Sequence, residues 1–157
     1  MALDVGDAIP DFTMPTDDGG TIARENLLGK TTVLYFYPRD DTPGCTTEAK
    51  GFRDALDDFI SAGVAIVGVS ADGIDSHGKF KAKHGLNFTL ASDTGSAFGQ
   101  ALGVWVEKSM YGKKYMGMER ATFLVDREGV VRRVWRKVKV PGHVAEVLAE
   151  ARRLAGA

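Results

Sequence analysis

The chain has 157 residues, a length that suits one domain, and we expect residues 1–157 to form a single domain. Hydrophobic residues make up 44% and charged residues 26%, which is ordinary for a globular protein, and the net charge of −1 gives no reason to expect a nucleic acid or an anionic membrane as partner. No apolar stretch approaches the roughly 18 residues of a membrane-spanning helix, and the first residues lack the basic flank and apolar core of a secretory signal.

The first half of the chain alternates between strand and helix patterns. Residues 1–31 are rich in turn residues and contain only short extended pieces. Residues 32–37 form a continuous apolar run with β-branched and aromatic side chains, typical of a strand covered on both faces. Apolar residues then recur at helical intervals, which predicts a helix over 46–62, and residues 64–70 read as a second buried strand.

The second half continues this alternation and ends differently. The predicted elements are a helix at 74–84, a strand at 88–92, a helix at 94–102 and paired strands at 121–125 and 130–138, with a last helix after Pro141-Gly142. Residues 103–118 show no clear period, and we expect a long loop there. Strands alternating with helices before a terminal hairpin predict a three-layer α/β domain with a mixed sheet. The basic stretch 132–139 suits an exposed sheet edge.

The single cysteine, Cys45, lies at the start of the predicted helix 46–62. Thr42 is a good N-cap, Pro43 a favoured first residue, and Cys45 then falls in the first turn. The amides of a first turn have no partner inside the helix and carry the positive end of its dipole, so both favour a thiolate. Cysteines in such positions titrate at roughly 3.5–7.5 instead of about 8.5. Cys45 is therefore a candidate nucleophile.

The same helical spacing places Cys45 on the face of Ala49, Phe52 and Leu56, so we expect its sulfur to be semi-buried beside a small pocket. Gly44 allows close approach of backbone or substrate. One cysteine cannot form an intrachain disulfide, which fits a reducing compartment, and the cytoplasm is the expected location.

The pattern Pro38-x3-Thr42-x2-Cys45 resembles the peroxidatic motif of the peroxiredoxins. The longer stretch from Tyr35 to Ala49 is most similar to their Q-type, or bacterioferritin-comigratory-protein, branch, part of the AhpC/TSA-like thiol peroxidases. The likeness continues along most of the chain, through Gly6-Asp7 with Pro10-Asp11-Phe12 and through Gly117–Asp126. The resemblance implies a thioredoxin-like α/β/α fold and the thiol-dependent reduction of hydrogen peroxide and organic hydroperoxides, in antioxidant defence and redox homeostasis.

The resemblance also implies roles for four residues. Cys45 would attack one peroxide oxygen and become a sulfenic acid. Thr42 would hydrogen-bond the peroxide, Pro38 would shield the sulfur, and Arg120 would stabilise the thiolate and the polarising O–O bond. Fixed donors at the leaving oxygen lower the barrier, and arginine offers both charge and geometry. No metal or organic cofactor is required.

One departure from the resemblance concerns the reductant. Many Q-type members carry a resolving cysteine five residues after the first, where this chain has Lys50. The sulfenic acid must therefore be reduced by an outside thiol: a thioredoxin- or glutaredoxin-like protein, or a small thiol. The resemblance suggests a monomer, although relatives also form dimers. We further hypothesise that residues 103–118, with Tyr115, lie near Cys45 and shape the pocket or the docking surface of the reductant.

Each of these assignments has a plainer alternative. Thr42 could only cap the helix, Pro38 could only end a strand, and Arg120 could be a solvated arginine at a strand entry. Glu48 is given a supporting role through the helix dipole. The histidines, for which surface or helix-end positions are predicted, share no ligand spacing and supply no partner for a Cys–His hydrolase: His77, His84 and His143.

The whole protein has two rival interpretations. In the first it is a redox-responsive binding or chaperone-like protein, in which oxidation of Cys45 is a signal. In the second it is a thioredoxin-like structural module without redox chemistry. Catalytic consumption of peroxide with added thiol distinguishes the enzyme from both.

Overall fold

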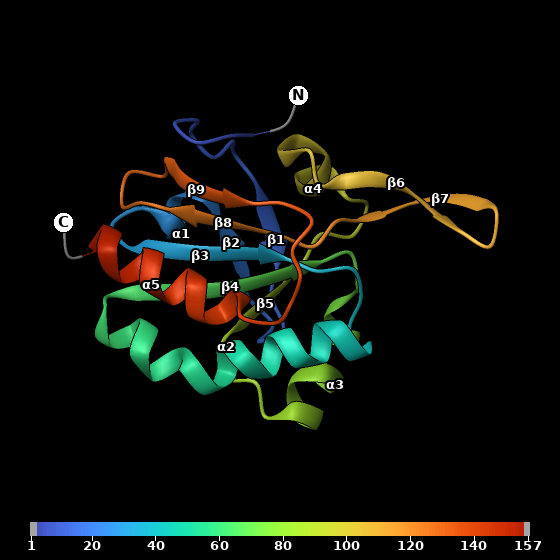
Figure 1. The fold of residues 1–157 in the computed structure, drawn as a ribbon, viewed down its shortest axis with the longest axis horizontal. Coiled ribbons are helices and arrows are strands. Elements are labelled where there is room, and N and C mark those ends of the chain that lie inside the picture. Colours follow the sequence, from blue (N-terminus) through green and yellow to red (C-terminus); the bar gives the residue numbers. More distant parts are fainter. Residues whose placement is uncertain (1–2, 156–157) are drawn as a thin grey trace.

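A mixed five-stranded sheet forms the centre of the computed structural model, which describes residues 3–155 (Figure 1). The strand order is β5-β4-β3-β8-β9. The strands β3 (Thr31–Phe36), β4 (Val64–Ser70) and β5 (Thr89–Ser92) run parallel, while β8 (Ala121–Val125) and β9 (Val131–Trp135) form an antiparallel pair at one edge. The predicted mixed α/β sheet is thereby confirmed, including the basic strand at its edge.

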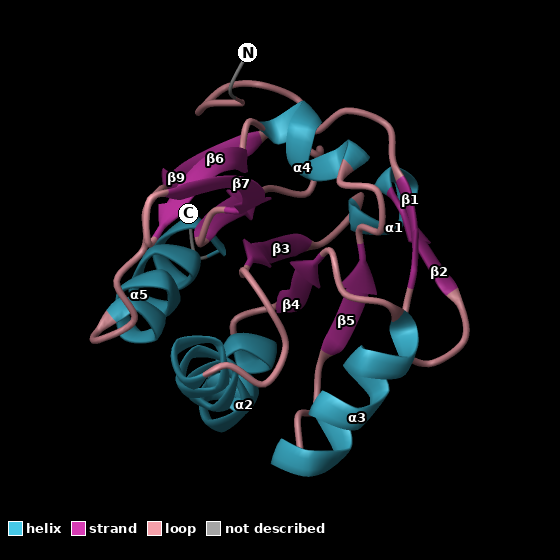
Figure 2. Ribbon diagram, turned by 90° about the vertical axis from the view of Figure 1, so that its right-hand side faces the viewer, coloured by secondary structure: helices cyan, strands magenta, loops and turns pink. Residues whose placement is uncertain are grey.

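Helices and a small hairpin cover the two faces of this sheet, giving the three layers seen in Figure 2. On one face lie α2 (Pro43–Ser61) and α5 (His143–Ala155), and α3 (Ile74–His84) packs beside β5. The other face carries α4 (Ala97–Leu102), the short α1 (Arg24–Leu27) and the hairpin of β1 (Thr13–Pro15) and β2 (Thr21–Ala23).

Each face of the sheet has its own hydrophobic core, because alternate side chains of one strand point to opposite sides. In β3, Val33 and Tyr35 join the core under α2 and α5, whereas Leu34 and Phe36 join the other core. All six residues of β3 are buried, as the continuous apolar run predicts for a central strand.

The loop predicted over 103–118 is wrong: these residues form a hairpin of β6 (Trp105–Met110) and β7 (Lys113–Met118). It projects from the body at the end of the sheet where β3 runs out into α2 (Figure 1). Most of its side chains are at least partly exposed, so no face needs the apolar alternation by which strands are recognised. Its two-residue turn, Tyr111-Gly112, has positive φ at both residues (52° and 78°), the geometry of a type I′ hairpin turn.

Smaller differences concern the ends of elements. The helix predicted to start at 46 begins at Pro43, the one predicted from 94 begins at Ala97, and the last predicted strand ends at Trp135. Among residues 3–155, no helix combines the length and the apolar character needed to cross a membrane.

Candidate active site

Cys45 is the third residue of α2, directly below the loop that leaves β3. Thr42 stands at the N-cap position with extended backbone, and Pro43 is the first helical residue, as predicted. The side chain of Cys45 belongs to the core face of the helix together with Ala49 and Phe52. Cys45 is only 1% exposed, more buried than the semi-buried position expected from spacing.

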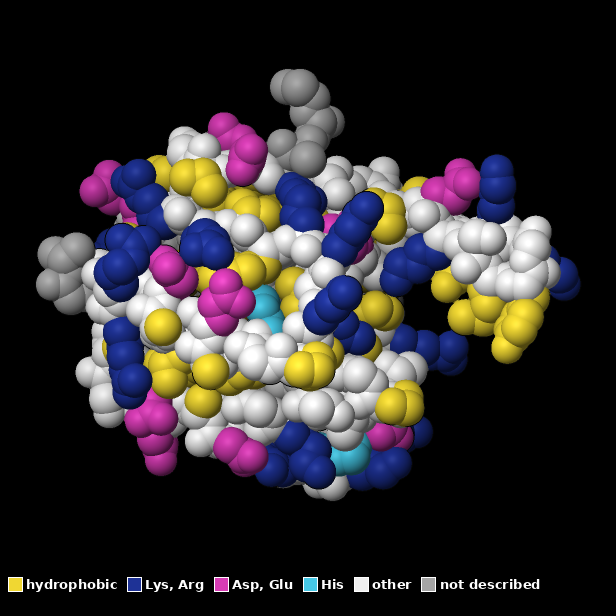
Figure 3. Space-filling model, viewed as in Figure 1, with side chains coloured by type: hydrophobic (Ala, Val, Ile, Leu, Met, Phe, Trp, Pro, Cys, Tyr) yellow, Lys and Arg dark blue, Asp and Glu magenta, His cyan; other side chains and the backbone are white. Residues whose placement is uncertain are grey.

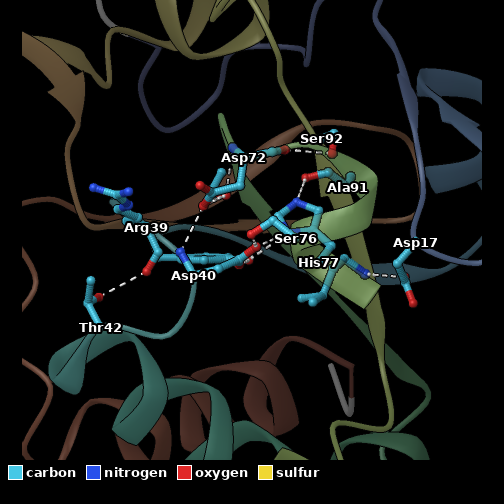
Figure 4. A network of polar contacts seen from close by, with 12 residues as sticks. Asp17, Arg39, Asp40, Thr42, Asp72, Ser76, His77, Ala91 and Ser92 are labelled. Atoms are coloured by element: carbon cyan, nitrogen blue, oxygen red, sulfur yellow. Dashed lines mark hydrogen bonds and ion pairs between the residues drawn. The ribbon is translucent and has the colours of Figure 1, made fainter. Parts of the chain in front are cut away.

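The hydroxyl of Thr42 does not cap the helix, contrary to the first expectation for this residue. It donates instead to the carbonyl oxygen of Arg39, at 2.9 Å, within the loop that precedes the helix (Figure 4). Because that proton is engaged, the lone pairs of the hydroxyl oxygen are the free part of the group. Thr42 is thus arranged to accept a hydrogen bond from a small hydroxylic molecule.

Arg120 reaches Cys45 because of the sheet register. β8 pairs with β3 so that Phe36, the last residue of β3, lies opposite Ala121. The residue before Ala121 therefore lies at the same end of the sheet as the loop that leads to α2. Arg120 Nη2 donates to the sulfur of Cys45 at 3.4 Å, which places a guanidinium directly beside the thiol.

The same guanidinium forms an ion pair with Glu48, one turn along α2 from Cys45. Arg120 Nη1 donates to Glu48 Oε1 at 2.8 Å, and Glu48 is fully buried. Within the described part of the chain, Glu48 Oε2 has no hydrogen-bond partner. Burial raises the pKa of Glu48 to about 7, and the attraction of Arg120 offsets only part of that rise. Glu48 is thus a full member of the site and not only the supporting residue predicted from the helix dipole; its position three residues after Cys45 was the available signal.

Arg120 itself remains a cation. Burial lowers its pKa, but the nearby Glu48 and Cys45 raise it, and the net direction is upward. Its side chain is 16% exposed. The guanidinium also lies close to the backbone: a Cβ atom on Gly44 would be 3.0 Å from Arg120 Nη2. The close approach expected at Gly44 is therefore made by the arginine.

A second cation, Lys108, comes from the β6–β7 hairpin. Its ammonium donates to the carbonyl of Met118 at 2.5 Å. Burial lowers the pKa of Lys108, and the charge of Arg120 lowers it further, while Cys45 and Glu119 act in the opposite direction. The charge of Lys108 is thus within electrostatic reach of Arg120 and Cys45.

Pro38 lies two residues beyond β3, half-buried, in the loop that ends at Thr42. Lacking an N–H, it donates no hydrogen bond to the site. Lys50, at the position where many relatives have their second cysteine, is exposed on α2.

The prediction of surface or helix-end histidines is wrong for His77; His84 and His143 do lie at helix ends, although His143 is buried there. His77 is fully buried in α3 and bonds Asp40 of the loop, and His143 is 4% exposed and bonds Thr122. Burial lowers the pKa of His143 to about 4, so it is neutral. Both replace apolar residues in the interior because each finds a polar partner, which the sequence alone does not reveal.

Within residues 3–155, no three histidine, cysteine or acidic side chains gather as metal ligands would. The chemistry available at the site is that of a thiol flanked by a guanidinium, a buried carboxyl and a hydroxyl.

Comparison with known proteins identifies the family. Residues 5–134 match the model of the AhpC/TSA family. The chain belongs to that family. It is 52% identical over 148 residues to a putative peroxiredoxin bcp of Coxiella burnetii, covering 94% of this chain and 98% of the relative. It is 49% identical to peroxiredoxin Bcp of Bacillus subtilis, with 94% of each chain covered.

Solved structures agree. Bacterioferritin comigratory protein of Xanthomonas campestris, studied for alkyl peroxide reduction, superposes with a TM-score of 0.90 at 44% identity, covering 98% of both chains. A cysteine-to-serine mutant of Xylella fastidiosa PrxQ gives a TM-score of 0.93 at 34% identity and 99% coverage of both. The thioredoxin-like fold and the Q-type resemblance are thereby confirmed. The chain is a peroxiredoxin and a thiol peroxidase, and its single cysteine fits a one-cysteine mechanism.

Proposed function

We propose that Cys45 is the peroxidatic nucleophile of this enzyme and that Arg120, Thr42 and Pro38 serve it. The observation that carries the proposal is the 3.4 Å contact from Arg120 Nη2 to the sulfur in the first turn of α2. A guanidinium and the free amides of a helix start both favour a thiolate. Because Cys45 is only 1% exposed, we expect small peroxides to reach its sulfur more readily than bulky ones.

In the reaction, the thiolate of Cys45 attacks one oxygen of the peroxide. The S–O bond forms as the O–O bond breaks, the sulfur gives up two electrons, and the leaving oxygen takes a proton to become water or an alcohol. Arg120 stabilises the charge that develops on that oxygen. The free lone pairs of Thr42 accept the peroxide O–H, and Pro38, at the rim of the loop, keeps water from the sulfur.

Reduction requires a thiol from outside the chain, since Cys45 is its only cysteine. One thiol attacks the sulfenic acid and releases water, leaving a mixed disulfide, and a second thiol then displaces Cys45 as a thiol. We propose a thioredoxin- or glutaredoxin-like protein as this reductant, with small thiols as substitutes. That requirement also favours the cytoplasm, where thiols are kept reduced.

The β6–β7 hairpin is the proposed docking surface for a protein reductant. Figure 3 shows hydrophobic side chains gathered on this arm. The exposed hydrophobic residues of the hairpin include Met110, Tyr115 and Met116, which are 56%, 44% and 50% exposed. The hairpin also carries lysines, which suit an acidic partner. Tyr115→Ala should raise KM for a protein reductant about fivefold and leave a small thiol unaffected. Unchanged kinetics with both reductants would remove the hairpin from the interaction.

Cys45, Thr42, Glu48 and Arg120 all come from one chain, which supports a monomer as the working assembly and residues 1–157 as one domain. Sedimentation of the reduced protein tests this assembly, and a dimer would contradict it.

The decisive experiment is a peroxidase assay with a panel of thiols, run beside Cys45→Ser. We expect the variant to show no turnover, because serine is not ionised at neutral pH and its oxygen does not carry the sulfur's redox chemistry. Oxidation of Cys45 that stops after one equivalent with every thiol would favour a redox sensor instead.

A further inference from the structure

A buried polar network connects the loop between β3 and α2 to α3 and β5 (Figure 4). None of its side chains takes part directly in the proposed reaction. At its centre, the carboxylate of Asp40 accepts hydrogen bonds from Tyr37 Oη at 2.5 Å and from Ser76 Oγ at 2.7 Å. His77 Nδ1 lies 2.7 Å from Asp40 Oδ2. The side chains of Asp40 and His77 are only 4% and 0% exposed. A charged group at this depth is retained only with partners, and Asp40 has three.

His77 contacts an acceptor with each of its ring nitrogens. Nδ1 faces the Asp40 carboxylate, and Nε2 lies 2.9 Å from the carbonyl oxygen of Ala91 in β5. A carbonyl and an ionised carboxylate can only accept, so both nitrogens must donate. Tyr37 Oη, 3.4 Å from Nδ1, is already donating to Asp40. The geometry therefore requires an imidazolium, and Asp40–His77 is a buried ion pair.

The charges around His77 agree with this protonation state. Burial lowers the pKa of His77, but the hydrogen bond and charge of Asp40, together with Ala91 and Asp72, raise it, and the net direction is upward. Asp72 follows β4, and Lys81, one turn along α3, is engaged by Asp17 at 2.6 Å.

The peptide unit between Arg39 and Asp40 connects this network to Thr42. Its N–H donates to Asp72 Oδ2 at 2.7 Å, while its carbonyl accepts the Thr42 hydroxyl at 2.9 Å. A peptide unit is planar, so fixing the N–H also fixes the direction of the carbonyl. Asp40, which belongs to that unit, is therefore the point through which the buried network orients Thr42.

We propose that Asp40 and doubly protonated His77 are positioning residues for peroxide reduction: they lock the peptide unit that aims the Thr42 hydroxyl at the substrate. The inference rests on the proposed function of Thr42 and Cys45. Since the pKa of His77 lies above its ordinary value, the ion pair is intact below pH 6.5 and is lost as pH rises through the folded pKa. The peroxide step then loses rate on the alkaline side.

The test is Asp40→Asn, which keeps the shape of the side chain and removes its charge. We expect the rate constant for oxidation of Cys45 by hydrogen peroxide to fall about tenfold at pH 7, since misplacement of a reacting group by about 1 Å costs up to about 100-fold. The alkaline decline should also move to lower pH, because His77 loses its counter-charge. A merely structural loss would lower the rate without moving the profile.

Asp41→Asn is the matched control. Asp41 is the next residue in the same loop, but its carboxylate is 43% exposed and pairs with Lys83 and His84 on the surface. Its φ of 59° is one that asparagine adopts readily. We expect its pH profile to match that of the unmodified protein.

Imidazole ¹⁵N NMR of the unmodified protein tests the ion pair without any variant, even where Asp40→Asn fails to fold. His77 should show two protonated nitrogens at pH 6, and its titration midpoint should coincide with the alkaline decline in the peroxide rate. A neutral His77 at pH 6, a rate that stays level through its midpoint, or an Asp40→Asn profile that does not move overturns the inference. Absence of peroxide turnover in the unmodified enzyme would instead refute the proposed function, while the NMR result still decides the ion pair.

Discussion

Two buried ion pairs lie on opposite sides of the loop that leads into α2, and their carboxylates differ in how many hydrogen bonds they accept. Asp40, behind the loop, accepts from Tyr37, Ser76 and His77, so both of its oxygens are engaged. Glu48, in front of the loop, uses only Oε1, for Arg120, and Oε2 is buried without a partner in the described part of the chain. Asp40 therefore has more hydrogen-bond partners within the protein than Glu48 has.

The difference follows from what each pair has to do. A fully satisfied buried network is rigid, and rigidity suits a support that orients Thr42. A carboxyl with one unsatisfied oxygen binds its cation less completely, and burial raises its pKa to about 7. Arg120 therefore keeps a donor, Nη2, for the sulfur of Cys45. The incomplete pair leaves the guanidinium available to the reaction.

Among changes to the two ion pairs, Arg120→Ala should have the largest effect on the peroxide step, because it breaks the Glu48–Arg120 pair in front of the loop (the front pair). The rate constant for peroxide should fall by about 100- to 1000-fold, as for loss of a donor to a developing oxyanion. The curve of Cys45 alkylation against pH should move to higher pH, because the thiolate loses its cation. Arg120→Lys, which keeps charge without the forked geometry, should be intermediate. Unaltered alkylation-versus-pH behaviour in Arg120→Ala would remove Arg120 from the mechanism.

The sequence predicts the central sheet and the placement of Cys45 well because both depend on local patterns. The apolar run 32–37 marks a central strand, and helical spacing after Cys45 places Ala49 and Phe52 on the core face. Local patterns do not, however, contain the register of β8 on β3. That register is what brings Arg120 to Cys45 across 75 residues, so only the family resemblance indicated Arg120.

The carboxylates of Asp40 and Glu48 show more clearly what local sequence patterns cannot predict. Asp40 lies inside the motif and Glu48 three residues after it, but an acidic residue near a helix start is usually solvated. Their burial depends on partners from distant elements, His77 from α3 and Arg120 from the entry to β8. The hairpin of β6 and β7 escapes prediction for the opposite reason, since its exposed strands carry no apolar alternation.

Glu48→Gln sharpens the comparison by removing the charge from the front pair while keeping an acceptor for Arg120. The pKa of Glu48 is about 7 in the folded protein against an ordinary 4.5, so the folded state binds the proton more tightly. Its stabilising contribution is complete below pH 4.5 and is lost as pH rises to 7, a loss of about 3 kcal/mol in the free energy of unfolding. Urea unfolding at pH 5 and pH 7.5 should show this slope reduced in Glu48→Gln.

Glu48→Gln should also change the dependence of Cys45 alkylation on pH. Without the Glu48 carboxylate, Cys45 is the one anionic partner that the described residues leave to Arg120, so the alkylation curve should move to lower pH. A move to higher pH would mean that Glu48 chiefly orients the guanidinium. The Glu48–Arg120 pair would then be a positioning pair, like Asp40–His77.

Gly44→Ala is the mildest change, because it displaces Arg120 without removing any charge. The new Cβ would lie 3.0 Å from Arg120 Nη2, so the guanidinium must retreat by a few tenths of an ångström from its 3.4 Å contact with the sulfur. We expect the peroxide rate constant to fall about two- to fivefold, a small part of the cost of losing a donor outright. Gly51→Ala is the matched control: on the same helix its Cβ would lie 3.0 Å from Val144 Cγ2, remote from the sulfur. If both variants alkylate and react with peroxide alike, the glycine at 44 does not set the position of Arg120, and the front pair is then held by Glu48 alone.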